Sequence, residues 1–367
     1  KARFAELGRA TMKLLQAIQA EKNRVLGPGQ PAVITANMGA LRADFPNIVL
    51  HGHVPPLTAA LICQAAKEAN ANVAALTGNE ISGPLMLPPV SNYDSQELVL
   101  LTGVVDVMVV GTQCVMPATL ALAAKMGTNI VPAGSVTTAA EAAAVAAAAQ
   151  KAFDGRRGKA VNIPEQSATV YAGYSAANSP QLIAALKEGY RQGRIRGLVY
   201  LGGCGNIDAT QDADFVAVAK ALLAQGYVVA TTGCAGTALA KAGLCTPANG
   251  EVVSELKACL PADIPAVLYL GACHDAATFI EMVQAVASSK MPVLALFPSV
   301  THGKVLATAM GFAVSHIPTL INCRQLGLDE AALAALNGPE SGMVMAFPAV
   351  SQIAAAVAQV AAAGERQ

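Results

Sequence analysis

Four cysteines each lie just beyond a short apolar run that is rich in β-branched residues. The runs are 107–110, 198–201, 227–230 and 266–270, and the cysteines that follow them are Cys114, Cys204, Cys234 and Cys273. Short apolar runs bounded by glycine are typical of buried parallel strands. Ligands of open α/β sheets gather at the carboxyl ends of such strands, so we expect these thiols to meet at one edge of the fold. Thiolates collected in this way suit iron, or iron with nickel, together with sulfide.

Each cysteine also has a simpler interpretation, because a buried cysteine usually acts as a small hydrophobic residue. That interpretation suits the remaining cysteines, which occur in helical or loop contexts: Cys63, Cys245, Cys259 and Cys323. The glycines beside the strand-end cysteines would let backbone approach a bulky inorganic ligand, or would suit a phosphate-binding loop. Neither Gly-x-Gly-x-x-Gly nor Gly-x-x-x-x-Gly-Lys-Ser/Thr occurs at them. The shared strand-end position therefore favours a common cluster or metal site.

A fifth apolar run ends in two histidines, His51 and His53, which flank a single glycine. Strand alternation predicts that both imidazoles point toward the same rim. The pair is a candidate for metal binding, and the alternative is a structural imidazole bonded to the backbone. His274 directly follows a strand-end cysteine and is expected to support it, whereas His316, before Ile-Pro, is expected to be structural.

Lys304 opens a predicted helix that follows another apolar run, in the sequence Thr-His302-Gly-Lys304. This position again corresponds to the carboxyl end of a strand. Most lysines are solvated surface charges, which is the alternative interpretation. Beside a metal cluster, a lysine would instead bond or protonate a bound oxyanion.

The elements that must position these residues alternate between strand and helix. Residues 1–22 predict an amphipathic helix that ends at the Gly and Pro residues of 27–31. Strands are predicted at 32–36, 47–51, 72–76, 104–110, 128–132, 168–173, 196–201, 227–231, 266–270, 292–297, 313–316 and 342–346. Helices are predicted at 55–70, 116–126, 138–153, 179–191, 210–225, 235–242, 274–288, 302–311, 328–335 and 349–363.

This rhythm predicts an α/β fold of two Rossmann-like domains with parallel sheets and a metal cluster between them. A polar, basic connector at 153–160 marks the boundary. We therefore expect an N-terminal helix plus a first Rossmann-like domain over 1–157, and a second such domain over 158–367.

The composition narrows the function. Of 367 residues, 54% are hydrophobic and 13% are charged, and the formal net charge is zero. Without a basic excess or any Trp, nucleic-acid binding is not expected. No run of about 18 apolar residues predicts a membrane span. The eight cysteines lack the dense spacing of a disulfide scaffold, so we expect a cytoplasmic protein. The start lacks Met and a signal-peptide core, which predicts a fragment or a processed form.

The motifs resemble the nickel–iron carbon monoxide dehydrogenases and, more distantly, the hybrid-cluster proteins. The matching pieces keep their order from about residue 33 to residue 350. They are His51-Gly-His53-Val-Pro-Pro-Leu, Thr77-Gly-Asn-Glu80, Ser95-Gln-Glu-Leu, Leu101-Thr-Gly-Val-Val-Asp106, Val109-Val-Gly-Thr-Gln-Cys114-Val-Met-Pro117, Gly203-Cys204-Gly-Asn206 with Gln211-Asp212, Val229-Ala-Thr-Thr-Gly-Cys234-Ala, Leu270-Gly-Ala-Cys273-His-Asp275 and His302-Gly-Lys304. The combination is specific, although each piece alone is not.

The resemblance implies a nickel–iron–sulfur C-cluster or a 4Fe–4S cluster, with one histidine of the His51/His53 pair on a pendant iron. The implied cluster ligands are Cys114, Cys204, Cys234 and Cys273. Lys304 matches the family lysine that hydrogen-bonds the carboxylate formed at the cluster, and His302 of the same motif is the second candidate catalytic residue. The implied reaction is the reversible oxidation of CO with water to CO₂, two protons and two electrons. Implied partners are CO and CO₂, an electron-transfer protein or a subunit with relay clusters, and a second copy in a homodimer.

Two departures from the family pattern bear on activity. The family has cysteine immediately before Thr-Gly-Asn-Glu, where this chain has Leu76, so a thiolate ligand of the pendant iron is missing. Either the cluster is a simpler iron–sulfur cube, or Glu80 or water takes that place. The family's N-terminal helical domain, with its relay cysteines, has no counterpart, so electrons would leave through another chain. Two alternatives stay open: an iron–sulfur redox protein with another small substrate such as hydroxylamine, and a non-catalytic scaffold that carries a cluster.

Overall fold

The structure is a computed structural model that describes residues 2–79, 85–322, 326–327, 329–336, 343–345 and 357. Contacts divide the chain into two compact units. The first unit is Lys22–Gly173, and the second combines Lys1–Glu21 with Tyr174–Gln367. Among the described residues, no helix has the length and apolar character needed to cross a membrane.

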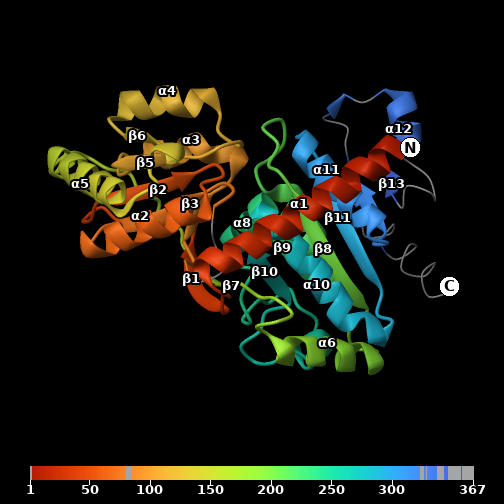
Figure 1. Cartoon of the computed structure of the whole chain (residues 1–367). Helices are drawn as coiled ribbons and strands as arrows, with labels where there is room; N and C mark the ends of the chain where they lie inside the picture. Colours follow the sequence, from red (N-terminus) through yellow and green to blue (C-terminus); the bar gives the residue numbers. More distant parts are fainter. Residues whose placement is uncertain are drawn as a thin grey trace. The chain divides into compact units, whose positions relative to one another are not determined.

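The first unit is built on a five-stranded parallel sheet in the order β4-β3-β2-β5-β6. The strands are β2 (Asn47–His51), β3 (Asn72–Leu76), β4 (Pro89–Ser91), β5 (Val107–Val110) and β6 (Asn129–Pro132). Helices lie on both faces of this sheet (Figure 1). One face carries α2 (Pro56–Glu68) and α5 (Ala139–Arg156), and the other carries α3 (Gln96–Leu101) and α4 (Pro117–Met126). Short 3₁₀ turns occupy η1 (Met38–Ala40), η2 (Tyr93–Ser95) and η3 (Ala133–Ser135), and β1 (Ala32–Ala36) pairs antiparallel with β7 (Ala168–Ala172).

The second unit has a parallel sheet in which the strands follow the order β10-β9-β8-β11-β12-β13. The strands are β8 (Gly197–Gly203), β9 (Tyr227–Thr232), β10 (Val267–Gly271), β11 (Val293–Ser299), β12 (Thr319–Ile321) and β13 (Met343–Met345). The helices are α6 (Pro180–Arg191), α7 (Ala213–Ala224), α8 (Gly233–Lys241), α9 (Ser254–Lys257), α10 (Ala277–Val286), α11 (Gly303–Val314) and α12 (Glu330–Leu336). The 3₁₀ turns are η4 (Cys273–Ala276) and η5 (Ala287–Ser289).

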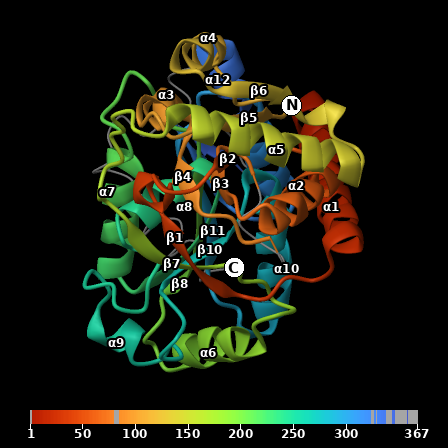
Figure 2. The ribbon, with the colours of Figure 1, turned by 90° about the vertical axis from the view of Figure 1, so that its left-hand side faces the viewer.

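The boundary between the units differs from the one expected at 157/158, for two structural reasons. Strand β7 pairs with β1 along its whole length, which keeps 168–172 with the first unit. Helix α1 (Ala2–Leu26) packs its first part against α11, where a Cβ at Gly8 would lie 2.6 Å from the Met310 carbonyl oxygen. Gln19 on the same helix donates to Thr278 Oγ1 of α10 at 3.0 Å. The first 21 residues therefore belong with the C-terminal half (Figure 2 shows α1 beside α10).

Both sheets have the same topological pattern. We number the parallel strands of each unit in chain order. The first strand then lies inside the sheet, the second and third strands lie on one side of it, and the fourth strand lies next to it on the other side. This is the strand order of the Rossmann fold. It arises because each right-handed crossover packs a helix on one face, and the reversal of direction sends later helices to the opposite face. The prediction of an α/β fold with parallel sheets is confirmed.

Each unit has its own apolar core. In the first unit, residues of β2, β3, β5, α3 and α4 form a buried cluster that includes Val49, Leu76 and Met108. In the second unit, Tyr200 lies with its ring centroid 4.7 Å from that of Phe312 and 5.2 Å from that of Phe279. Tilted aromatic contacts of this kind add to the stabilisation that burial provides.

Most predicted elements match the structure, and the differences among the described residues concern one strand and several short elements. The strand predicted at 313–316 is wrong, because α11 continues to Val314 and the next strand begins at Thr319. The sequence analysis missed the short elements β4, α3 and α9. The helix predicted at 349–363 lies outside the described residues, except for Val357.

Candidate metal centre

Several of the predicted site residues lie at the switch points of the two sheets. In the first unit this point lies between β2 and β5, which lead into His51–His53 and into the loop of Cys114. In the second unit it lies between β8 and β11, which lead into Cys204 and the segment 302–304. Connections that leave neighbouring strands toward opposite faces open a crevice there, which is why open α/β sheets bind ligands at this place.

Three cysteines of the second unit lie at adjacent strand ends. Cys204 follows the last residue of β8, Cys234 is the second residue of α8 directly after β9, and Cys273 opens η4 after β10. Gly233 has φ 58, and a Cβ on it would lie 2.7 Å from Cys273 Cβ. Glycine therefore allows the turn of Cys234 to approach the turn of Cys273 closely.

Nearby thiols affect the pKa values of two buried tyrosines, Tyr200 and Tyr269. Burial raises the pKa of Tyr200, and the negative charges of Cys273, Asp275 and Cys204 raise it further. Burial likewise raises the pKa of Tyr269 well above its ordinary value, with contributions from Cys245, Cys234 and Cys273. The three strand-end thiols of this unit therefore share one neighbourhood around the two phenols.

Lys304 lies at the same edge. It is the second residue of α11, and its Nζ donates to Cys273 Sγ at 3.4 Å. His302 is half-buried, with Nδ1 2.8 Å from Thr301 Oγ1, and this hydroxyl in turn donates to the Gly205 carbonyl at 3.4 Å. Burial lowers the pKa of His302, and the charge of Lys304 lowers it further. The structure thus brings a cation and a neutral imidazole to the cysteine edge.

In the first unit, the backbone of His53 is bonded to the loop that carries Cys114. His53 N donates to Thr112 O at 2.7 Å, and Thr112 N donates back to His53 O at 3.1 Å. Gly111 makes this contact possible, because a Cβ there would lie 2.1 Å from the His53 carbonyl oxygen. His53 Nε2 lies 3.2 Å from the position of a Cβ on Gly78, so its ring packs against the turn after β3.

His51 differs from His53. It is 0% exposed, with Nε2 2.8 Å from Gln96 Oε1 and Nδ1 3.1 Å from Thr77 Oγ1. Burial lowers its pKa to about 4, and the nearby oxygens of Gln96 and Leu76, which favour a protonated ring, oppose this effect. Strand alternation does not extend to His53, because β2 ends at His51 and Gly52 has φ 76. Strand alternation therefore does not orient His53, although both rings approach the turn of Thr77 and Gly78.

Leu76, at the departure from the family pattern, is a core residue. It is the last residue of β3, it is 0% exposed, and it belongs to the same buried cluster as Val49 and Ala74. Its carbonyl accepts from Gly52 N at 3.3 Å and from Asn79 Nδ2 at 2.9 Å. Glu80, the predicted substitute ligand, lies outside the described residues.

The described cysteines expected to be structural have raised pKa values, and Cys245 is buried whereas Cys63 and Cys259 are partly exposed. Burial raises the pKa of Cys63 to about 12 and also raises the pKa of Cys245 and Cys259. Such thiols carry little thiolate and do not ligate metals readily. Cys323 lies outside the described residues.

The two other histidines occupy turns. His274 is buried beside Asp275, with Nε2 4.0 Å from its Oδ2, and Asp275 Oδ2 accepts from Ala272 N at 2.8 Å. These contacts hold the η4 turn that starts with Cys273. His316 has φ 61 just beyond the end of α11.

Thiols of this kind are the donors that iron–sulfur clusters use. Within the described ranges, no three His, Cys, Asp or Glu side chains converge as the ligands of one metal ion do. A cluster takes one thiolate for each iron at its corners, so its ligands surround it. Thiols on successive strand ends, glycines that allow close backbone approach, and a lysine bonded to one sulfur fit an iron–sulfur group of this kind.

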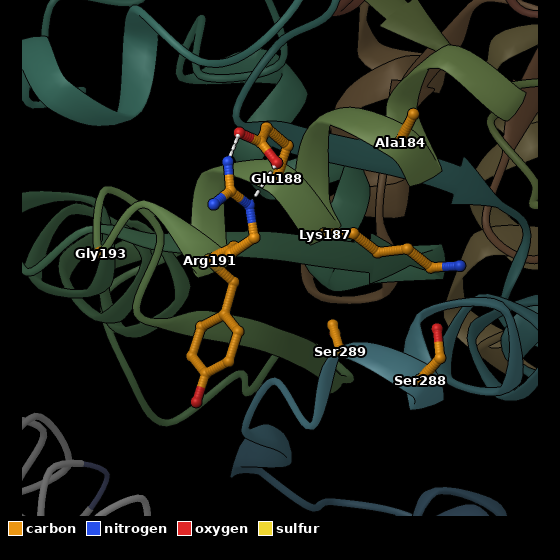
Figure 3. Close-up of a pocket in the computed structure, with 8 residues that line it drawn as sticks. Ala184, Lys187, Glu188, Arg191, Gly193, Ser288 and Ser289 are labelled. Carbon is orange, nitrogen blue, oxygen red and sulfur yellow. Dashed lines mark hydrogen bonds and ion pairs between the residues drawn. The ribbon is translucent and has the colours of Figure 1, made fainter.

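An open pocket in the described part of the chain lies elsewhere. Lys187, Glu188 and Arg191 of α6 line it together with Ser288 and Ser289 of η5, and it encloses about 760 Å³ (Figure 3). These residues precede β8 and β11, whereas the cysteines follow their strands, so the pocket lies at the opposite edge of the sheet. Arg191 Nε is already paired with Glu188 Oε2 at 2.8 Å. The carboxyl end of α6 also disfavours an anionic ligand.

Fold and site together define an α/β protein with thiols at neighbouring strand ends, and comparisons with known proteins identify its family. The model of the Prismane/CO dehydrogenase family matches residues 2–324, and the chain belongs to this family. It is 31% identical over 350 residues to carbon monoxide dehydrogenase 2 of Carboxydothermus hydrogenoformans, covering 81% of this chain and 55% of that protein. It is also 31% identical to the carbon monoxide dehydrogenase/acetyl-CoA synthase subunit beta of Moorella thermoacetica, with 80% and 52% covered.

Solved structures similar to this chain are also carbon monoxide dehydrogenases. Carbon monoxide dehydrogenase IV from Carboxydothermus hydrogenoformans superposes with a TM-score of 0.84 at 28% identity, covering 94% of this chain and 63% of that one. A chain from a structure of acetyl-CoA synthase/carbon monoxide dehydrogenase, described for NiZn[Fe4S4] and NiNi[Fe4S4] clusters in its alpha subunits, gives 0.84 at 26% identity, with 94% and 60% covered. The chain thus spans about half the length of the curated relatives it matches.

The sequence analysis missed the supporting residues of the site. Gln96 was noticed only as part of a family motif, and Tyr200, Tyr269 and Thr301 were not singled out. A polar side chain inside an otherwise apolar strand, such as either tyrosine, is the one signal that could have indicated a buried hydrogen bond.

Proposed function

We propose that this chain is a carbon monoxide dehydrogenase-like metalloenzyme, an oxidoreductase that interconverts CO and CO₂ at an iron–sulfur centre. In its complete form this centre would also contain nickel. The observation that carries the proposal is Lys304 Nζ bonded to Cys273 Sγ, at an edge where three strand-end cysteines share one neighbourhood. Membership in the family supports the same chemistry.

The ligands in this proposal are Cys114, Cys204, Cys234 and Cys273. One histidine of the His51/His53 pair would bind the pendant iron, and both ring nitrogens of His51 have protein partners. When bound, the cluster would supply a site for CO and for water activation, together with storage of two electrons.

Lys304 and His302 would handle charge and protons around that centre. The Lys304 ammonium is held by a cysteine sulfur and is a donor for the oxygen of a carboxylate formed there. His302 has a lowered pKa, so it is neutral near pH 7 and can accept a proton on the nitrogen that does not face Thr301. Electrons would pass to a partner protein or to a subunit with relay clusters, and a homodimer is part of the proposal.

The core position of Leu76 favours a second candidate, an iron–sulfur redox protein that acts on another small substrate. Without a thiolate at position 76, the centre would be a simpler iron–sulfur cube that lacks the pendant iron. A protein that carries such a cluster without catalysing a reaction is the non-catalytic form of this candidate. A reducing compartment such as the cytoplasm is part of the proposal in each version.

Anaerobic reconstitution with iron, sulfide and nickel tests the proposal. Nickel together with about four irons per chain, and CO-dependent reduction of a dye, is the expected result. Iron without nickel would favour the second candidate, and a chain that binds neither metal would refute both. Cys204→Ala should abolish the visible absorbance of the cluster, whereas Cys245→Ala, at a buried cysteine with a raised pKa, should preserve it.

A further inference from the structure

One buried amide joins the His51 strand to the Cys114 loop. Gln96 is 0% exposed and uses every hydrogen-bonding group of its side chain. Its Nε2 donates to Tyr93 O at 2.8 Å and to Cys114 O at 3.3 Å. Its Oε1 accepts from Met116 N at 2.9 Å, from Thr119 Oγ1 at 2.9 Å and from His51 Nε2 at 2.8 Å.

These hydrogen bonds fix the orientation of the Gln96 side-chain amide. A backbone carbonyl can only accept and a backbone N–H can only donate, so the NH₂ group must face Tyr93 and Cys114 while the oxygen faces Met116. His51 Nε2 must then carry its proton, because it faces the same oxygen. Its Nδ1 consequently keeps a lone pair, which accepts from the Thr77 hydroxyl at 3.1 Å.

The loop that Gln96 contacts has a strained backbone. Gln113 and Cys114 have φ values of 61 and 56, in the left-handed region that residues other than glycine seldom adopt. Such a conformation persists only where the surroundings determine it. The two contacts from Gln96 flank the thiol-bearing residue, one at the Cys114 carbonyl and one at the Met116 N–H.

We infer that Gln96, oriented by His51, is a positioning residue that holds the Cys114 loop in its strained form and so presents the thiol to a metal centre. We call the hydrogen bonds of Gln96 to His51, Cys114 and Met116 the clasp. The use of the Cys114 thiol as a metal ligand rests on the proposed function, but the clasp itself does not. In this inference His51 acts through Gln96 and is not a ligand.

Gln96→Glu tests the clasp in the metal-free chain. The replacement keeps an oxygen for Met116, His51 and Thr119, but it turns the donor toward the Cys114 carbonyl into a second acceptor. We expect alkylation of Cys114 by iodoacetamide, followed by peptide mass spectrometry, to accelerate about tenfold, roughly the effect of one lost hydrogen bond. Thr58→Val is the matched control, because it removes a buried bond to Val136 O in the same unit, and it should change the rate less than about twofold.

The imidazole provides a second readout that general loosening would not produce. Nitrogen NMR of wild-type His51 should show a neutral ring protonated at Nε2, and Gln96→Leu should abolish that preference. Equal Cys114 rates in Gln96→Glu and Thr58→Val, or a wild-type ring protonated at Nδ1, would overturn the inference. Neither outcome depends on metal loading, so failure of the clasp is distinguishable from failure of the proposed function.

Discussion

Leu76→Cys restores the residue type that the family pattern has before Thr-Gly-Asn-Glu, and the structure predicts that it will not restore a ligand. The Leu76 side chain is fully buried in the core cluster of the first unit, against residues of β2 and β3. A thiol at this position would therefore lie in an apolar core and would remain protonated. Replacing leucine with the smaller cysteine leaves a cavity, and Leu→Ala changes in such cores cost about 3–5 kcal/mol. We expect Leu76→Cys to cost about 2–3 kcal/mol, since the sulfur retains part of the volume.

Urea unfolding of the metal-free chain measures this loss, with Leu76→Ala and the volume-conserving Leu76→Met as references. Leu76→Met should cost less than about 1.5 kcal/mol. After anaerobic reconstitution, the iron and nickel contents of Leu76→Cys should equal those of Leu76→Ala. A higher metal content or faster CO oxidation in Leu76→Cys than in Leu76→Ala would refute the placement of this side chain in the core.

Three further predictions address the site and the stability of the fold. Lys304→Ala should lower CO oxidation by about a hundredfold, the scale of a lost proton-handling group, while the cluster absorbance is retained; parallel loss of both would show that the residue is structural. Burial raises the Cys63 pKa from 9.0 to about 12, so the unfolded thiol ionises first as the pH rises, and native stability falls above pH 9. Wild type should lose about 1.4 kcal/mol more than Cys63→Ala between pH 7 and pH 10, and equal alkaline slopes in urea unfolding would contradict this. Arg156→Met leaves the Asp106 carboxylate buried without the guanidinium 2.8 Å away, and it should cost about 3–5 kcal/mol, in contrast to Arg157→Met at an exposed pair.

The fold was predictable where the local pattern agreed with the tertiary structure. The β-branched runs before Cys114, Cys204, Cys234 and Cys273 are buried strands because both faces of each sheet are covered by helices, as the rhythm of the sequence implied. The pattern failed at 313–316, where the apolar residues close α11, because a helix buried on most of its surface has no polar stripe. The membership of the first 21 residues depends on contacts with α10 and α11, which no local signal records.

The site was predictable in its location but not in its supporting contacts. Strand ends and glycines indicated where thiols would gather, and the structure places Lys304 at one of those thiols. The different environments of His51 and His53 depend on one left-handed glycine and on a glutamine 45 residues away along the chain. The direction of the Leu76 side chain depends on the core of α3 and α4. Interactions between distant residues leave no periodic trace in the sequence, so only coordinates reveal them.

The turns that carry the candidate ligands are held by protein contacts that need no metal. Before Cys234, the Gly233 carbonyl accepts from Tyr269 Oη at 3.2 Å and from Thr237 Oγ1 at 3.2 Å, and Tyr200 Oη lies 2.6 Å from Thr232 Oγ1. These phenols come from β10 and β8, the two strands that flank β9, so the turn is fixed from both sides. Gln96 has the same relation to the Cys114 loop in the first unit. Ligands that are ordered before the metal arrives lose little conformational freedom on binding, and more of the interaction energy is then available to hold the cluster. The Cys234 turn and the Cys114 loop are each stabilised by their own buried hydrogen bonds, so neither conformation depends on a complete set of metal ligands.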